Sequence, residues 1–177
     1  MRKKRAICHV LTAATAAAFV GGTAATGQLR GGAQPKNDQH TFARYVNVRF
    51  KYAICYPKDL LVPQGESANS DGQKFLSNDG VELIVYGTNN ALNETLKERM
   101  SETQARLAGA TGKVTYKVQK ANWFVLSGQN GQTVFYVKTL SSHGQFKSFE
   151  LTYDRSAAAL YDPLVGRFVS CFNDLAA

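Results

Sequence analysis

The sequence predicts an α+β domain in which an antiparallel sheet of about six or seven strands packs against two main helices. Two observations support this class. Short segments of alternating apolar and polar residues recur along the chain, separated by turns rich in Gly, Asn and Asp. Two longer segments have helical spacing instead, one near the middle of the chain and one at its end. Behind an N-terminal leader, about 150 residues remain, which is the size of one domain.

The first strand is expected at residues 46–56, where apolar and polar side chains alternate. Pro57 should end it, because proline has no backbone N–H to donate to a neighbouring strand. Strand parity places Cys55 on the face opposite Tyr52 and Ile54.

A hairpin is expected next, with strands at 73–77 and 81–87 joined by the turn Asn78-Asp79-Gly80. The segment 90–108 then changes to helical spacing, and Gly109 is a suitable stop for the helix. Its apolar stripe should cover the sheet.

Four further strands and a second helix complete the predicted order. The short connections between the strands favour an antiparallel meander. The final helical segment contains an Asp162-Pro163 step, and proline suits the first turn of a fresh helix. The expected ranges are 113–119, 122–128, 132–140 and 146–153 for the strands and 156–172 for the helix.

The N-terminus has the three parts of a signal peptide, namely a basic start, an apolar stretch and a zone of small residues. We expect a signal peptide at residues 1–25, a flexible arm at 26–40 and one globular domain at 41–177. A membrane anchor is the alternative, but the apolar stretch is shorter than the roughly 20 residues that a spanning helix needs. Cys8 should leave with the leader. We therefore expect a periplasmic or secreted protein without stable membrane insertion after processing.

Removal of the leader also weakens the basic character of the chain. The full sequence has 21 basic and 13 acidic residues. Four of the basic residues lie in the leader, which leaves 17 against 13 and a net charge of +4. The remaining excess is spread without a Lys/Arg run, so nucleic acid is not an expected partner.

Cys55 and Cys171 are the two cysteines that remain after processing. In an oxidising compartment two such cysteines usually pair, so a bridge between the first strand and the last helix is expected. Buried free thiols are the alternative. Strand parity places Cys55 on the less apolar face, so a bridge requires the last helix to reach that face.

No catalytic motif stands out in the sequence. A Cys-His nucleophile would need an imidazole beside a thiolate, and the mature chain offers only His40 in the arm and His143 in a turn. Ser127 precedes a glycine but lacks the G-x-S-x-G elbow of hydrolases. No cofactor is expected, and no metal site.

The polar connection 62–73 is the first candidate binding site, because long loops on a rigid scaffold often carry recognition. Its candidate residues are Gln64, Glu66, Asn69 and Asp71. Carboxylate and amide oxygens could also bind calcium, but Asn, Asp and Gly are ordinary turn residues. A solvated loop without a ligand is the alternative.

The outward face of the meander is the second candidate. Lys113 and Lys117 recur on one side of their expected strand, and the next strand contains Trp123. A basic and aromatic surface of this kind could hold a glycan, an anionic partner or a nucleic acid, although one charged face is normal for any half-exposed strand.

The order of elements resembles the Mog1/PsbP-like α/β/α sandwich. Residues 49–61, RFKYAICYPKDLL, are similar to the aromatic strand followed by Tyr-Pro or Leu-Pro with which many bacterial envelope members begin. Residues 55–75 and 78–87 resemble uncharacterised exported proteins of Gram-negative bacteria. The resemblance implies protein binding without a common active site.

Two classes of function remain after these considerations. The first is a non-enzymatic protein-binding domain of the bacterial envelope, such as an accessory, inhibitor or immunity-like protein, whose partner is another envelope protein. The second is an envelope enzyme or small-ligand carrier whose site no motif reveals. Only the second requires a concave pocket with convergent polar groups.

Overall fold

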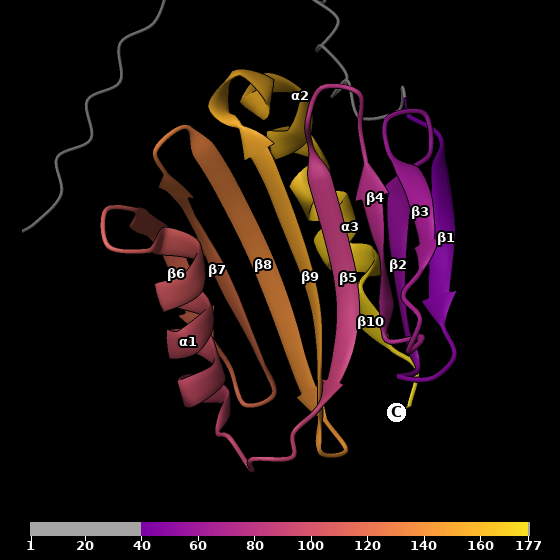
Figure 1. Cartoon of the computed structure of the whole chain (residues 1–177), viewed down its shortest axis with the longest axis vertical. Helices are drawn as coiled ribbons and strands as arrows, with labels where there is room; N and C mark the ends of the chain where they lie inside the picture. The colour runs from indigo at the N-terminus through magenta and orange to yellow at the C-terminus, as the bar shows by residue number, and fades with distance from the viewer. Residues whose placement is uncertain (1–39, 177) are drawn as a thin grey trace, which may run out of the picture. The chain divides into compact units, whose positions relative to one another are not determined.

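The computed structural model describes residues 40–176. The predicted signal peptide and, except for His40, the predicted arm lie outside the described residues. Within these residues two sheets and several helical segments form an α+β domain (Figure 1). The predicted fold class is confirmed.

The large sheet has seven antiparallel strands in the order β3-β4-β5-β9-β8-β7-β6. Strands β6 to β9 form the predicted meander. The bounds are β3 Val62–Glu66, β4 Gly72–Leu76, β5 Glu82–Asn89, β6 Lys113–Gln119, β7 Trp123–Asn130, β8 Thr133–Ser142 and β9 Gln145–Asp154.

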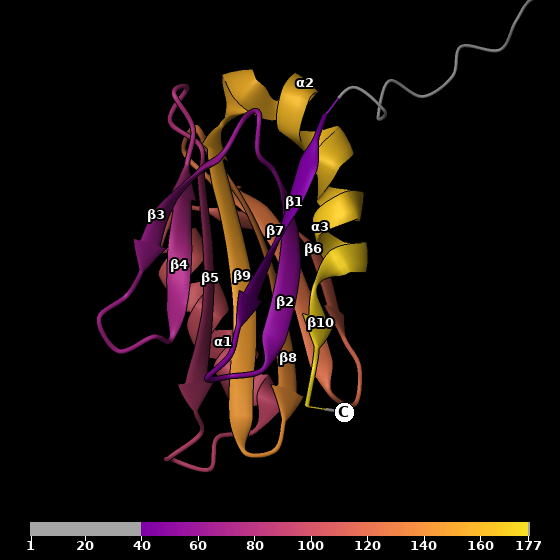
Figure 2. The same ribbon diagram turned by 90° about the vertical axis from the view of Figure 1, so that its right-hand side faces the viewer.

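The small sheet has three antiparallel strands in the order β1-β2-β10. It lies across one face of the large sheet together with the C-terminal helices (Figure 2). The bounds are β1 Phe42–Asn47, β2 Tyr52–Pro57 and β10 Asn173–Asp174, with the helical segments Arg155–Ala157, α2 Ala158–Tyr161, Asp162–Leu164 and α3 Val165–Cys171.

The other face of the large sheet carries α1, Leu96–Ala108. The prediction started this helix at residue 90, whereas it begins after Thr95. Thr95 and Glu98 form a capping box, in which the Thr95 hydroxyl accepts from the Glu98 N–H at 3.2 Å and the Glu98 carboxylate accepts from the Thr95 N–H at 2.7 Å. The Asn90 side chain holds the preceding loop by accepting from the Glu94 N–H at 2.8 Å.

Two of the predicted segments are wrong. Residues 46–56 are not one strand, because the chain turns between β1 and β2. The Asn47 side chain accepts from the Phe50 N–H at 2.7 Å, and Lys51 adopts a left-handed φ of 51°. Residues 62–73 are not one loop but contain β3, an edge strand whose residues are all exposed.

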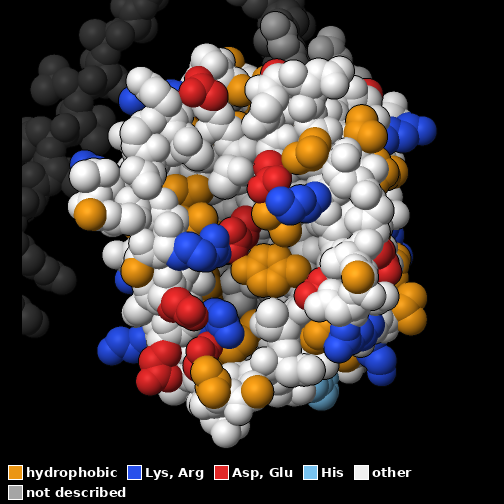
Figure 3. Space-filling view, viewed as in Figure 1, with side chains coloured by type: hydrophobic (Ala, Val, Ile, Leu, Met, Phe, Trp, Pro, Cys, Tyr) orange, Lys and Arg blue, Asp and Glu red, His pale blue; other side chains and the backbone are white. Residues whose placement is uncertain are grey.

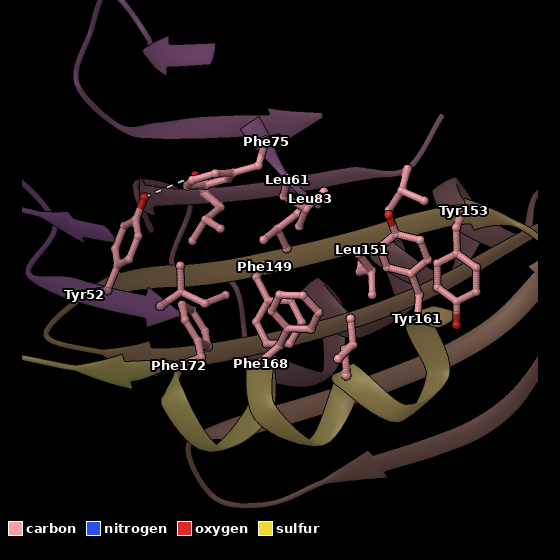
Figure 4. Close-up of a cluster of buried hydrophobic side chains, with 14 of the residues drawn as sticks. Tyr52, Leu61, Phe75, Leu83, Phe149, Leu151, Tyr153, Tyr161, Phe168 and Phe172 are labelled. Carbon is pink, nitrogen blue, oxygen red and sulfur yellow. Dashed lines mark hydrogen bonds between the residues drawn. The ribbon is translucent and has the colours of Figure 1, made fainter. Parts of the chain in front are cut away.

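The main core lies between the large sheet and the layer that contains β2 and α3. It is rich in aromatic side chains, and Phe149 in β9 packs against Phe168 and Phe172 (Figure 4). A second core lies under α1, where Met100 packs on Phe124 and Phe135. The two cores fix both helical layers on a single rigid sheet.

Candidate functional site

The helical layers cover opposite halves of the large sheet. On one face, α1 packs over β6 and β7. On the other face, β2 and α3 pack over β5 and β9. The α1 side of β4 and β5 is therefore left without a covering helix (Figure 1). In the same view, hydrophobic, basic and acidic side chains gather around a hollow in this part of the surface (Figure 3).

A hydrogen-bonded group of three side chains lies at this uncovered region. Tyr86 is on β5, and its hydroxyl donates to Oε1 of Glu150 on β9 at 2.7 Å. Arg106, in the last turn of α1, forms an ion pair with the same carboxylate oxygen. The Glu150 side chain is only 7% exposed, whereas that of Arg106 is 52% exposed. The three side chains thus join the sheet to α1 and leave the guanidinium accessible.

Burial and charge together favour the protonated forms of Tyr86 and Arg106 in this group. Burial raises the pKa of the Tyr86 hydroxyl above its ordinary value, and the negative charge of Glu150 adds to the effect. Burial opposes the charge of Arg106, but the bond to Glu150 outweighs it and the pKa of the guanidinium lies above its ordinary value. Tyr86 therefore acts as a fixed hydrogen-bond donor rather than as a base.

A second ion pair lies on the same face. Lys74 on β4 is opposite Ile84 on β5, and its Nζ is 3.1 Å from Oε2 of Glu82. Strand parity places Glu82 and Ile84 on the same face as Tyr86. We call the surface formed by Lys74, Glu82, Ile84, Tyr86, Arg106 and Glu150 the Tyr86 groove. Its floor is apolar and aromatic, and its charges are paired with one another.

The β3–β4 hairpin forms one wall of this groove. A cavity of about 390 Å³ is lined by Gln64 and Asp71 together with Lys74, Ile84 and Tyr86. The structure thus brings two of the four residues predicted in segment 62–73 to this surface. Asp71 is held in its turn because its carboxylate accepts from Nδ2 of Asn69 at 2.8 Å.

The other two predicted residues of the segment have local contacts. Glu66 accepts from the Tyr45 hydroxyl at 2.7 Å. Asn69 bonds to Asp71, and its carbonyl oxygen accepts from Arg49. Neither Glu66 nor Asn69 lines the cavity.

The predicted basic and aromatic surface of the meander is not assembled. A β-bulge between Val114 and Tyr116 shifts the register of β6, so Lys113 and Lys117 lie on opposite faces of the sheet. Lys117 faces α1 and donates to Oε1 of Gln104 at 2.8 Å. Trp123 lies at the other end of β7 from the residue that pairs with Lys113.

Cys55 and Cys171 form a disulfide, with their Cα atoms 5.5 Å apart. The position of Cys55 on the less apolar face of its strand does not prevent the bridge. Helix α3 contacts β2, and both elements lie on the same face of the large sheet. Cys171 is the last residue of α3 and thereby reaches the strand. Neither sulfur is a free thiol.

The remaining titratable groups do not form a metal site. Among residues 40–176, no three His, Cys, Asp or Glu side chains are grouped closely enough to hold a metal ion. His40 Nδ1 lies 2.6 Å from Oδ2 of Asp59, and this contact lowers the pKa of that carboxyl.

No helix in the described part of the chain is long and apolar enough to cross a membrane.

The central residues of the Tyr86 groove were missed in the sequence. One signal was available, because Glu82, Ile84 and Tyr86 alternate with the core residues Leu83 and Val85. The partner residues could not be found in this way, since Glu150 and Arg106 are 64 and 20 residues from Tyr86 in the chain.

Comparisons with known proteins identify the fold. The solution structure of cyanobacterial PsbP (CyanoP) from Synechocystis sp. PCC 6803 superimposes with a TM-score of 0.56. The match covers 81% of this chain and 98% of that one, with 14% sequence identity. The fold is Mog1/PsbP-like.

The predicted resemblance is thus confirmed at the level of architecture. No family model matches the chain, and no curated protein matches it. A structural match at this low sequence identity establishes the fold but does not assign roles to residues.

Proposed function

We propose that this chain is an exported, non-enzymatic protein-binding domain of the bacterial envelope, and that it binds another envelope protein through the Tyr86 groove. The observation that carries the proposal is the hydrogen-bonded group of Tyr86, Glu150 and Arg106 on an uncovered sheet face. Tyr and Arg are among the residues that dominate binding energy at protein interfaces. Here the groups are already held in position, which lowers the entropic cost of binding.

Export is supported by the leader-like N-terminal sequence and by the disulfide. The bridge between Cys55 and Cys171 suits an oxidising compartment such as the periplasm or the extracellular space. The mature chain would begin close to Ala25. Sequencing of the N-terminus of the exported protein tests this part, and an N-terminus that still begins at Met1 would contradict it.

The chemistry of the groove favours binding over catalysis. Oε1 of Glu150 is already occupied, because it accepts from Tyr86 and is paired with Arg106. Tyr86 would have to be deprotonated to act as a base or a nucleophile, and its raised pKa opposes this near neutral pH. A small-ligand carrier is a second candidate, because the cavity beside Gln64 and Tyr86 has the volume of a small-molecule site.

The test is parallel capture from envelope extract with four versions of the protein. The wild type should retain a stoichiometric protein partner, and Tyr86→Ala should lose it. Exchange of the charges by Lys74→Glu with Glu82→Lys keeps an internal ion pair but reverses the field of the groove, so it should also lose the partner. The control is Tyr116→Ala, which removes a 54% exposed tyrosine from β6.

A partner that both groove variants retain would refute the assignment of the groove. If the wild type captures no protein, the binding function itself is refuted. A low-molecular-weight compound that co-purifies with the wild type and is absent from Tyr86→Ala would favour the carrier.

A further inference from the structure

The two large apolar side chains with the highest exposed fractions lie at one end of the domain. Val48 is 83% exposed and Leu92 is 82% exposed, the two highest values among the large hydrophobic residues at positions 40–176. Val46 and Leu175, each 41% exposed, belong to the same end. Four exposed apolar residues at one end of the domain differ from the scattered single residues that are normal on a soluble surface.

Hydrogen bonds join the segments at this end of the domain. The Leu175 N–H donates to the carbonyl of Lys51 at 2.7 Å, which ties the C-terminal segment to the β1–β2 turn. The Asn90 N–H donates to the carbonyl of Gly144 at 2.8 Å, which ties the loop before α1 to the β8–β9 turn. Asp174 bonds to Ser142 and thereby connects the two pairs.

Together these segments form the lower end of the domain in both views (Figures 1 and 2). We call this surface the loop end. It consists of residues 46–51, 90–97, 142–145 and 174–176.

The charge of the loop end is unevenly distributed between fixed and free groups. Its two carboxylates form ion pairs within the domain, Asp174 with Lys147 and Glu94 with Arg99 at 2.9 Å. Glu98 follows directly after the loop end and bonds only to the neutral Thr95. Arg49, Lys51 and Lys97 are exposed, and none of them has an ion-pair partner within the described residues. Within the loop end, the charges that remain outside ion pairs are therefore positive.

We propose that the loop end docks on an anionic lipid surface. Apolar side chains at the tips of turns can enter the headgroup region, and neighbouring lysines are attracted to acidic lipids. A protein partner fits less well, because interface hot spots are usually aromatic or Arg side chains in pockets, whereas Val48 and Leu92 are almost fully exposed on turns.

Docking of this kind sets the orientation of the molecule. The antiparallel strands of the large sheet extend between the loop end and the opposite end of the domain (Figure 1). The sheet would stand upright on the lipid surface, with the Tyr86 groove facing sideways. The proposal does not depend on the function of that groove.

The test is co-sedimentation with vesicles, using the protein purified as the cell makes it, so that every variant has the same N-terminus. Vesicles of phosphatidylcholine are compared with vesicles that contain about one third phosphatidylglycerol, at low and high salt. The apolar variant is Val48→Ser with Leu92→Ser. The basic variant is Lys51→Asn with Lys97→Gln, in which asparagine tolerates the left-handed backbone at 51. The control is Val62→Ser, which changes a 56% exposed valine of β3.

The wild type should bind the anionic vesicles, and binding should weaken as salt rises. Each double variant should lose roughly tenfold or more in affinity, while the control should bind like the wild type. All versions should give the same circular dichroism spectrum and unfolding temperature, because the changed side chains are exposed. The absence of vesicle binding by the wild type, or equal binding by the apolar variant, would overturn the proposal. Loss of a protein partner by the apolar variant without any vesicle binding would assign the loop end to a protein contact.

Discussion

The C-terminal strand β10 depends on a buried ion pair. The Lys147 side chain is fully buried in β9, and its ammonium bonds to Asp174, whose side chain is 17% exposed. Asp174 also accepts from the Ser142 hydroxyl and the Ala176 N–H. Replacement of Asp174 by Asn removes the countercharge and leaves the ammonium buried without one.

The expected loss of stability follows from this burial. Breaking a buried pair by removing one partner costs about 3–5 kcal/mol. Partial exposure of Asp174 and the remaining amide oxygen of Asn reduce the loss, so we expect about 2–3 kcal/mol. For a domain of this size the midpoint of thermal unfolding should fall by about 10 °C.

The assay is urea unfolding of the wild type, Asp174→Asn, Lys147→Met and the double variant. The double variant removes both charges and should recover most of the loss, with a coupling of about 2 kcal/mol. A loss below about 0.5 kcal/mol for Asp174→Asn, or no coupling in the cycle, would show that the pair of Lys147 and Asp174 does not stabilise the domain.

Acid should abolish the contribution of the Lys147–Asp174 ion pair to the free energy of unfolding. Burial alone would raise the pKa of Asp174, but the bonds from Lys147 and Ser142 outweigh it and hold that pKa below its ordinary value of 3.8. A lowered folded-state pKa gives stability that is complete above the unfolded value and is lost as the pH falls through the folded value. The stability difference between the wild type and Asp174→Asn should therefore shrink below about pH 3.8.

Three further changes test the fold. Replacement of Cys55 and Cys171 by Ala should lower the free energy of unfolding by up to about 5 kcal/mol, because the bridge closes a long loop; urea unfolding that matches the wild type would contradict this. Gly87→Ala should cost about 1–3 kcal/mol, since a Cβ there would collide with the buried Phe50 ring; a thermal midpoint equal to that of the wild type would show that the ring can move. Thr95→Ala should cost about 1 kcal/mol through loss of the α1 cap, and calorimetry can measure it against Ser101→Ala in the exposed middle of the helix.

The sequence predicted the elements whose patterns repeat. The meander from β6 to β9 and the break at Pro163 were located correctly, because alternation and turn residues mark them directly. Edge strand β3 was missed since both of its faces are exposed, and hydrophobic alternation requires one buried face. The β1–β2 turn lacks Gly or Asn-Gly, and the alternation continues through it because Phe50 enters the core.

The candidate site was less predictable than the fold. One bulge residue in β6 places Lys113 and Lys117 on opposite faces of the sheet, and no pattern in that segment marks a bulge. The Tyr86 groove is built from side chains on β5, α1 and β9, so only the sheet order brings them together. Gln64 and Asp71 reach the same surface because β3 pairs with β4.

The proposed function requires that the Tyr86 groove bind a protein partner. The most direct measurement is a calorimetric titration of the captured partner into the wild type, Tyr86→Ala and Tyr116→Ala. A central aromatic residue of an interface carries about 2 kcal/mol or more, which is about 30-fold in Kd. We expect at least that loss for Tyr86→Ala and a change of less than about twofold for Tyr116→Ala. Equal affinities of the wild type and Tyr86→Ala would show that the partner does not bind at the Tyr86 groove.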